Sequence, residues 1–211
     1  MITLAVKAIL AYLLGALVGS LLVGRLRGGI DIRRLGSGNA GGTNALRTQG
    51  KAFAFWVMLI DIGKGWLATG VLCGLSLPGL PSGPQREWTL AICGIAVMIG
   101  HVYPVWFGFK GGKGVATLIG AVLGVAPMLL LPMLAVWLLA VMLVGYVGLA
   151  SILGAVTFAF EAARHRALLP FAAVAAVIII YTHRSNIRRM LTGTEPRARR
   201  LWLFAMRSRS S

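Results

Sequence analysis

The chain has 211 residues, of which 58% are hydrophobic and 12% are charged. Soluble domains carry about 25% charged residues, so this composition excludes an ordinary soluble fold. The charges are also uneven, with 21 Lys and Arg against 5 Asp and Glu and a formal net charge of +16. Because the basic residues alternate with apolar runs, we expect lipid phosphate or a phosphorylated substrate as the acidic partner, not nucleic acid.

Seven apolar runs of spanning or near-spanning length follow one another along the chain. They cover about 8–24, 52–77, 88–102, 115–131, 133–150, 151–163 and 167–182. We predict an all-α integral membrane protein with a bundle of seven transmembrane helices, forming a single polytopic domain over residues 1–211. Charges at Glu161, Arg164 and Arg166 weaken the sixth run, and five helices are the alternative.

The basic residues predict the orientation. Sixteen of the 21 lie in three segments, between residues 25 and 51, at 110 and 113, and from 184 onward. Only Lys7 and Arg86 clearly lie on the other side. By the positive-inside rule the three basic segments are cytoplasmic. The N-terminus is then external, the C-terminus is cytoplasmic, and residues 196–211 form a basic cytoplasmic tail.

The first cytoplasmic segment contains a glycine-rich run from Gly36 to Asn44, followed by Arg47. Glycines let backbone N–H groups approach an anion, and Ser37, Asn39, Thr43 and Asn44 add neutral donors. If a helix starts here, Thr43 or Asn44 caps it and Arg47 returns on the same face. The helix N-terminus and the guanidinium then bind the same phosphate. The alternative is a flexible loop between two helices.

Ionisable residues inside the second apolar run are Asp61 and Lys64, spaced i, i+3. Such groups at membrane depth tend to face the bundle and pair, so we expect an internal Asp61–Lys64 or Asp61–Arg ion pair with a structural role. Direct contact with substrate is the alternative. Cys73 and Cys93 fall in apolar runs and are interpreted as packed core residues.

The second basic segment contains His101 and Pro104, then the run Gly111-Gly112-Lys113-Gly114. At a helix entrance this run offers bare backbone N–H groups, the positive end of a helix dipole and an ammonium, which predicts a second phosphate site. A turn with lysines and aromatics anchored at the interface is the alternative. His101 is either functional or a packed, hydrogen-bonded histidine.

The third basic segment begins at His183. On a helix leaving the membrane, His183 and Asn186 share one face and Arg184 and Arg188 share another, so the first pair is predicted to enter a site. A wholly interfacial basic helix is the alternative. Glu195 is expected to form an ion pair that holds the tail.

Two phosphate sites beside a helix bundle fit acyl transfer between a phosphorylated lipid-like donor and a phosphorylated acceptor. A phosphate leaving group lowers the demand for a strong nucleophile, which agrees with the absence of a G-x-S-x-G elbow from the sequence. We expect neither a metal nor a cofactor.

Three motif groups resemble the signature segments of the bacterial PlsY family, which are acyl-phosphate:glycerol-3-phosphate acyltransferases. They are Ser37-Gly38-Asn39-x-Gly41-x-Thr43-Asn44 with Arg47, Gly100-His101-x-x-Pro104 with Gly111-Gly112-Lys113-Gly114-Val115-Ala116-Thr117, and His183-Arg184-x-Asn186-Ile187-x-Arg189 with Gly193-Thr194-Glu195. The resemblance covers essentially the whole chain. Two positions depart from the pattern, since Gly42 stands where Ala or Ser is usual and Gly148 where Ser is common.

The resemblance implies transfer of a fatty acyl group from acyl phosphate to the sn-1 hydroxyl of glycerol 3-phosphate, giving lysophosphatidic acid and phosphate in the first acylation step of phospholipid biosynthesis. It implies catalytic roles for Ser37, Arg47, His183 and Asn186 and a structural role for Glu195. The substrate- and phosphate-binding residues that it implies are Gly38, Asn39, Thr43, Asn44, His101, Gly111, Gly112, Lys113, Gly114 and Ser151.

The implied location is the bacterial cytoplasmic (inner) membrane, with the active site facing the cytoplasm. Membrane lipids and the enzyme that produces acyl phosphate are the implied partners. The general base is either His183 or a substrate phosphate. An organophosphate transporter or lipid-binding membrane protein is the alternative from another class, although the sequence has no visible inverted repeat to support it.

Overall fold

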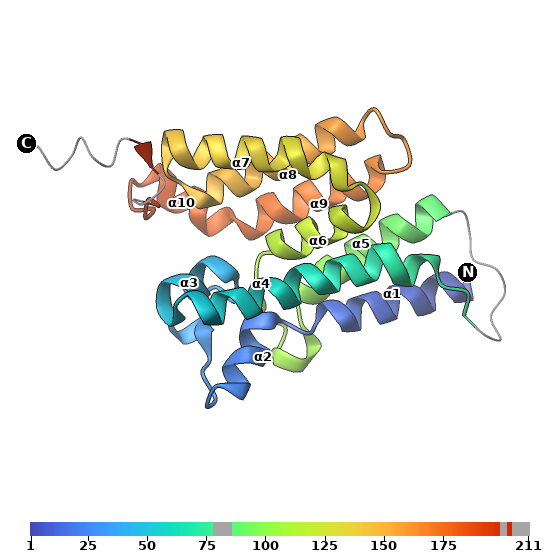
Figure 1. Ribbon diagram of the computed structural model, residues 1–211, viewed down its shortest axis with the longest axis horizontal. Helices are drawn as coiled ribbons and strands as arrows, with labels where there is room; N and C mark the ends of the chain where they lie inside the picture. Colours follow the sequence, from blue (N-terminus) through green and yellow to red (C-terminus); the bar gives the residue numbers. More distant parts are fainter. Residues whose placement is uncertain (78–85, 199–201, 204–211) are drawn as a thin grey trace, which may run out of the picture. The chain divides into compact units, whose positions relative to one another are not determined.

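The structure is a computed structural model that describes residues 1–77, 86–198 and 202–203 (Figure 1). Within these ranges the chain forms helices and turns and no strand, which confirms the predicted all-helical class there. The chain divides into two compact units, Met1–Pro127 and Met128–Ser211.

The first unit pairs α1 with α5 and α4 with α6, while α2 and α3 pack on α4. Its helices are α1 (Ile2–Gly15), α2 (Gly19–Leu26), α3 (Gly42–Gln49), α4 (Lys51–Trp66), α5 (Arg86–Val102) and α6 (Val115–Val125). Short helical turns are η1 (Ile32–Arg34), η2 (Leu67–Val71), η3 (Leu72–Gly74) and η4 (Val105–Phe107), of which η2 is a π-helical continuation of α4.

Glycines allow these helices to approach closely. A Cβ on Gly100 of α5 would lie 2.9 Å from the backbone nitrogen of Ala16, just beyond the end of α1. A Cβ on Gly65 of α4 would lie 2.8 Å from the backbone nitrogen of Ala121 on α6. Small residues at such contacts let membrane helices pack through their backbones.

The break between α1 and α2, where the chain bends by 48°, is stabilised by Asp61 and Lys64 of α4. Lys64 Nζ donates to the carbonyls of Gly15 and Leu17 at 2.9 and 3.0 Å, and Asp61 Oδ1 accepts from the N–H of Gly19 at 3.0 Å. The two side chains also form the expected ion pair, with Nζ 2.9 Å from Oδ1. A break between helices leaves backbone groups without partners in the helix, and this pair binds three of them, the carbonyls of Gly15 and Leu17 and the N–H of Gly19.

In the second unit α8 packs against both α7 and α9, and α10 contacts α8 and α9. After η5 (Pro127–Leu129), its helices are α7 (Leu130–Val144), α8 (Val147–Ala162), α9 (Leu169–Thr182) and α10 (Arg184–Leu191). Phe158 of α8 and Phe171 of α9 are fully buried and meet edge to face with ring centroids 5.6 Å apart.

Among the described residues, three helical segments are long and apolar enough to cross a membrane: Lys51–Gly74, Glu87–Phe107 and Pro127–Val144. The bent pair α1 and α2 adds a fourth if it forms one span, and α6, α8 and α9 are shorter apolar helices. Each predicted apolar run therefore overlaps a helical segment, and the count of seven crossings stays a prediction.

Two predicted boundaries are wrong. The helix expected over 115–131 ends at Val125, because the residue before Pro127 is disfavoured in the α conformation. The boundary expected between 150 and 151 lies at Gly145, which has a φ of 84° and terminates α7 as a left-handed glycine.

The predicted tail, 196–211, falls mostly outside the described residues. Within them, the Arg197 guanidinium lies 5.1 Å from the ring centroid of Tyr146 and 4.2 Å from that of Trp202. The N–H of Ala198 donates to the Gly145 carbonyl at 2.8 Å. The start of the tail is thus held against the α7–α8 turn of its own unit.

Candidate active site

Asn44 holds the first glycine-rich loop, residues 31–41, which we call loop one. Its side chain is buried, and Oδ1 accepts from the N–H of Ser37 at 3.0 Å. Nδ2 lies 3.0 to 3.2 Å from the carbonyl oxygens of Ile32, Leu35 and Asn39, so its two hydrogens are shared among three acceptors. Because one amide engages four backbone groups, loop one has a fixed conformation and is not a flexible linker.

Glycine is required at Gly36. This residue has a φ of 56°, and a Cβ added to it would collide with Asn44 Oδ1 and lie 2.8 Å from Thr48 Cγ2. The neighbouring Ser37 and Gly38 are exposed. Loop one therefore presents its predicted catalytic serine on an outer face while its inner face packs on Asn44.

The start of α3 differs from the prediction. Its N-cap is Gly41, in an extended conformation and without a side-chain cap, so the expectation that Thr43 or Asn44 caps the helix is wrong. Asn44 lies in the first turn and its side chain reaches back into loop one instead. Thr43 and Arg47 are four residues apart and both exposed, so Arg47 shares a face with Thr43 and not with the buried Asn44.

The second glycine-rich loop, residues 103–114, is called loop two, and it folds back on the end of α5. The N–H groups of Gly111 and Gly112 donate to the carbonyls of Val102 and His101 at 3.0 and 3.1 Å. The expectation that these two glycines offer bare N–H groups to a phosphate is therefore wrong. Donors toward an anion must come from farther along the loop.

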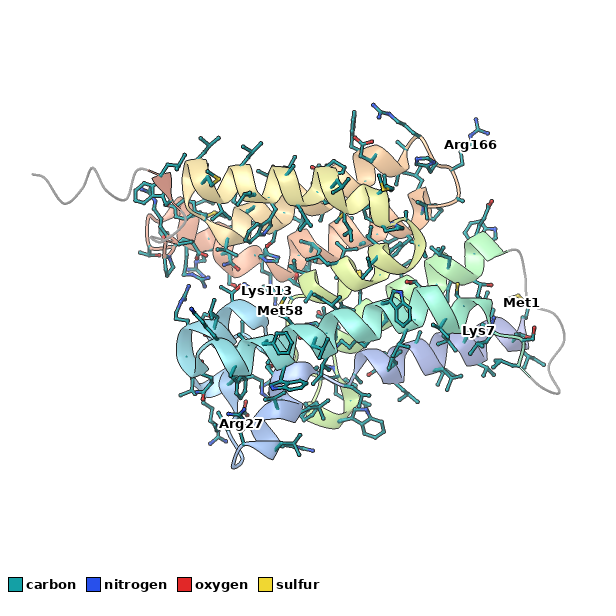
Figure 2. All side chains as sticks on the ribbon, in the orientation of Figure 1. Met1, Lys7, Arg27, Met58, Lys113 and Arg166 are labelled. Carbon is teal, nitrogen blue, oxygen red and sulfur yellow. The ribbon has the colours of Figure 1, made fainter. Side chains whose placement is uncertain are left out.

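Those donors lie at the start of α6. Lys113, labelled in Figure 2, is followed by Gly114, the N-cap of α6 with a φ of 88°, and the helix begins at Val115. The first N–H groups of a helix lack partners within the helix and form its positive end. Lys113 thus stands directly before a helix N-terminus, as the sequence predicts.

His101 is buried behind loop two. His101 Nδ1 lies 2.8 Å from Lys64 Nζ and 3.4 Å from Asp61 Oδ1, so the buried Asp61–Lys64 pair holds the ring in place. Nε2 faces Gly112, where an added Cβ would collide with it. His101 therefore supports loop two at Gly112 from the buried side, and its influence on a substrate would pass through Gly112.

The two loops meet within the first unit. A Cβ on Gly112 would lie 2.9 Å from the carbonyl oxygen of Ala40, so the backbones of the two loops touch there. Phe107 of loop two is buried in a hydrophobic cluster with Ile32 and Ala40 of loop one. The two predicted phosphate sites are thus neighbours.

Arg33 joins the same two loops and was not singled out by the sequence patterns. Its NH1 donates to the carbonyls of Phe107 and Lys110 at 2.8 and 2.9 Å. Its Nε and NH2 donate to Oδ1 and Oδ2 of Asp31, each at 2.9 Å. The Asp31-x-Arg33 spacing was the available signal, since a carboxylate two residues away can orient a guanidinium.

In the second unit, His183 lies at the junction of α9 and α10 and is buried. Its Nδ1 is 2.8 Å from the Ile179 carbonyl oxygen, which can only accept, so Nδ1 carries a hydrogen. In the neutral ring Nε2 is then the basic nitrogen. This tautomer is the one that a general base at Nε2 requires.

Asn186 and Glu195 form a clamp at α10. Asn186 Nδ2 donates to Glu195 Oε1 at 2.6 Å, and Arg189 Nε donates to Glu195 Oε2 at 2.7 Å. Asn186 is buried, whereas Arg184 and Arg188 are exposed, as the predicted division of faces requires. The carboxylate of Glu195 therefore orients Asn186 while it closes the turn after α10.

Ser151 and Gly148 lie one turn apart on α8. Ser151 Oγ donates to the Val147 carbonyl at 2.9 Å, within the helix. A Cβ on Gly148 would lie 2.9 Å from Asn186 Cβ, so α10 rests directly on α8 at this glycine. Glycine at position 148, where the family pattern has Ser, thus leaves room for the side chain of Asn186.

The predicted site residues fall into two groups. The first unit holds Ser37, Gly38, Asn39, Thr43, Asn44, Arg47, His101, Gly111, Gly112, Lys113 and Gly114, and the second holds Ser151, His183, Asn186 and Glu195. Among the described residues, no cluster of three or more His, Cys, Asp or Glu side chains is suited to hold a metal ion.

A family model for glycerol-3-phosphate acyltransferase matches residues 5–193. Curated relatives include the glycerol-3-phosphate acyltransferase of Chlorobaculum tepidum, 40% identical over 226 residues, covering 93% of this chain and 97% of the relative. The enzyme of the same name from Aquifex aeolicus is 42% identical over 192 residues, covering 90% and 96%.

Solved structures agree with these matches. The crystal structure of PlsY (YgiH), an integral membrane glycerol 3-phosphate acyltransferase, in its glycerol 3-phosphate form superposes with a TM-score of 0.78 at 37% identity. The alignment covers 92% of this chain and 94% of that one. The lysophosphatidic acid form of the same protein gives a TM-score of 0.77.

Proposed function

The chain belongs to the glycerol-3-phosphate acyltransferase family, as an integral membrane acyltransferase of PlsY type, and from this premise we propose its reaction. A fatty acyl group passes from acyl phosphate to the sn-1 hydroxyl of glycerol 3-phosphate. The products are lysophosphatidic acid and inorganic phosphate. This is the first acylation step of phospholipid biosynthesis.

The observation that carries the proposal is the contact between two glycine-rich loops in the first unit. The reaction brings together two phosphate groups, one on the donor and one on the acceptor. Loop one with Arg47, and loop two with Lys113 and the N-terminus of α6, supply two neighbouring sets of donors for them.

We assign the donor phosphate to loop one. Ser37 and Gly38 are exposed on this loop, and Thr43 and Arg47 share an exposed face of the adjacent α3. A guanidinium beside hydroxyl groups binds phosphate through charge-assisted hydrogen bonds. Ser37 and Arg47 are the residues of this set to which we give catalytic roles, because they stabilise charge on the departing phosphate and the tetrahedral oxyanion. Asn39 completes the set of polar side chains on the loop.

We assign the glycerol 3-phosphate to loop two, Gly111 to Gly114. Lys113 and the first N–H groups of α6 hold its phosphate, while Gly111 and Gly112 shape the loop. The sn-1 oxygen attacks the acyl carbonyl carbon, the bond from that carbon to the phosphate oxygen breaks, and phosphate leaves with the electron pair.

His183 accepts the proton of the attacking hydroxyl in this proposal. The hydrogen bond from Nδ1 to the Ile179 carbonyl supports the role, because it directs the basic lone pair to Nε2. Asn186 of α10, oriented by Glu195, supports the same reaction. We also include Ser151 of α8 among the residues that bind substrate phosphate. The alternative acceptor of the proton is a substrate phosphate.

The membrane topology follows the same proposal. Seven crossings place the N-terminus outside and the C-terminus, the basic tail and both loops in the cytoplasm of a bacterial inner membrane, within one polytopic domain. The basic residues of the three segments support this orientation. Anionic headgroups contact the tail, and the enzyme that makes acyl phosphate supplies the donor.

The test is an assay of the purified protein with palmitoyl phosphate and glycerol 3-phosphate. We expect lysophosphatidic acid and phosphate in equal amounts, and no product when either substrate is omitted. Lack of product under conditions in which a known relative is active contradicts the proposal. Uptake of glycerol 3-phosphate into vesicles without acyl transfer would instead favour a transporter.

A further inference from the structure

We infer that Arg33 is a positioning residue that sets the spacing between loop one and loop two and thereby the affinity for the acceptor. Arg33 does so by binding backbone groups of loop two. The inference rests on the proposed function, because it assumes that loop two binds glycerol 3-phosphate.

The side chain of Arg33 connects Asp31 of loop one to a turn of loop two that is distant in sequence. On one side, Nε and NH2 bind the two carboxylate oxygens of Asp31, and Asp31 Oδ1 also accepts from the N–H of Arg33 at 3.0 Å. On the other side, NH1 donates to two carbonyls, 74 and 77 residues farther along the chain. Nε, NH1 and NH2 are all engaged with protein acceptors, which separates Arg33 from a residue that binds substrate directly.

The turn held by Arg33 contains an unfavourable backbone conformation. Phe109 has a φ of 57°, a region that bulky residues rarely adopt, and Gly108 before it has a φ of 66°. The two carbonyls bound by Arg33, those of Phe107 and Lys110, flank this pair. A strained turn persists only when its surroundings fix it. The guanidinium does so by binding one carbonyl before the strained pair and one after it.

The held turn leads directly into the proposed acceptor site. Lys110 is followed by Gly111 and Gly112, whose N–H groups bind the end of α5, and then by Lys113. The carbonyl of Lys110 that Arg33 binds therefore lies three residues before the ammonium that we place on the substrate phosphate.

Arginine is needed here because of its shape. A guanidinium presents five N–H groups in a planar fork, whereas a lysine ammonium is a point charge on a flexible stem. Lysine at this position could reach Asp31 or the carbonyls of the turn, but it could not hold both in fixed geometry. The hydrogen bonds from Arg33 lower the pKa of Asp31 below its usual value, so the carboxylate is charged at neutral pH and keeps the fork aligned.

The chain offers a matched control in the adjacent Arg34. Its side chain is exposed and it belongs to the same helical turn, η1. Arg34→Lys changes the same chemical group without touching the link between the loops. Arg33→Lys keeps the charge and is the primary variant, and Arg33→Ala is the second.

The experiment measures KM for each substrate and, without substrate, hydrogen exchange at the amides of residues 105–114. For Arg33→Lys we expect KM for glycerol 3-phosphate to rise about tenfold or more, KM for palmitoyl phosphate to change less than about threefold, and exchange in loop two to quicken. Arg34→Lys should match the wild type in all three.

An unchanged KM for the acceptor, an equal rise in both KM values, or unchanged exchange in loop two would overturn the inference. The exchange measurement requires no turnover. If the wild type makes no lysophosphatidic acid, the proposed function fails, whereas normal wild-type turnover with an unaffected Arg33→Lys variant refutes only the role of Arg33.

Discussion

The loops of the first unit and the α10 region of the second are built in different ways. Loops one and two are shaped by glycines and by hydrogen bonds to backbone carbonyls, with Asn44 and Arg33 as the organising side chains. The α10 region depends on contacts between side chains, in which Glu195 holds both Asn186 and Arg189.

The proposed reaction gives these two regions different chemical tasks, which are anion binding for the loops and proton transfer for the α10 region. An anion is well held by backbone N–H groups and a helix N-terminus, which require close backbone approach and fixed turns. Proton transfer requires one side chain in a fixed tautomer and orientation, which a helix junction and a hydrogen-bonded clamp provide. We therefore expect changes in the first unit to act mainly on binding and changes near α10 mainly on rate.

The largest effect is expected at His183. His183→Gln should lower kcat by about 10² to 10⁴ and leave KM for glycerol 3-phosphate nearly unchanged, because it removes the proposed base and leaves the proposed phosphate contacts in place. Steady-state assays of purified protein measure both. His165→Gln, at an exposed histidine of the turn between α8 and α9, is the control and should be neutral. Near-normal kcat in His183→Gln would assign the proton to a substrate phosphate.

A smaller but severe loss is expected for Gly112→Ala. The new Cβ would collide with His101 and lie 2.9 Å from the Ala40 carbonyl oxygen, neither of which can move without disturbing both loops. We expect kcat/KM for the acceptor to fall by about 100-fold. Gly63→Ala on α4, where a Cβ meets open space, is the matched control. Equal activity of the two variants would show that the loops do not need to touch.

An intermediate effect is expected at the clamp. Glu195→Gln removes the charge that binds Arg189 but keeps an oxygen for Asn186, so kcat should fall about three- to tenfold with little change in KM. Glu161→Gln removes the partner of exposed Arg164 and serves as the control. A rise in KM without a fall in kcat would show that the clamp acts on substrate binding and not on the rate of the reaction.

The smallest effect is expected for Gly42→Ala, at a position where the family usually has Ala or Ser. Its Cβ would lie 2.5 Å from Sδ and 3.1 Å from Cγ of Met58, which is labelled in Figure 2. Methionine is an unbranched, flexible side chain that can move aside. Activity should remain within about twofold of the wild type. A large loss would mean that Met58 is fixed and that Gly42 is matched to it.

Much of the fold could be predicted because membrane helices depend on local composition. Apolar length placed a helix in each expected run, and the i, i+3 spacing predicted the Asp61–Lys64 pair. The two helix ends at Val125 and Gly145 were missed because an apolar run continues through them, while Pro127 and the left-handed Gly145 interrupt the backbone.

The sequence predicted which residues form the candidate site, but not which groups their side chains and backbone amides bind. Glycine spacing identified both loops, yet it could not tell that the amides of Gly111 and Gly112 bind α5, or that Asn44 reaches back into loop one. These outcomes depend on residues distant in sequence. Arg33 was overlooked for the same reason, since its partners Phe107 and Lys110 lie in another loop.

The most direct test of the division between binding and rate is calorimetric titration of glycerol 3-phosphate into two purified variants, Lys113→Ala and His183→Gln. We expect Lys113→Ala to raise the Kd for glycerol 3-phosphate about tenfold or more, since it removes the proposed charge-assisted contact, while the Kd of His183→Gln stays within about threefold of the wild type. Equal weakening in both variants, or normal affinity in Lys113→Ala, would contradict this division.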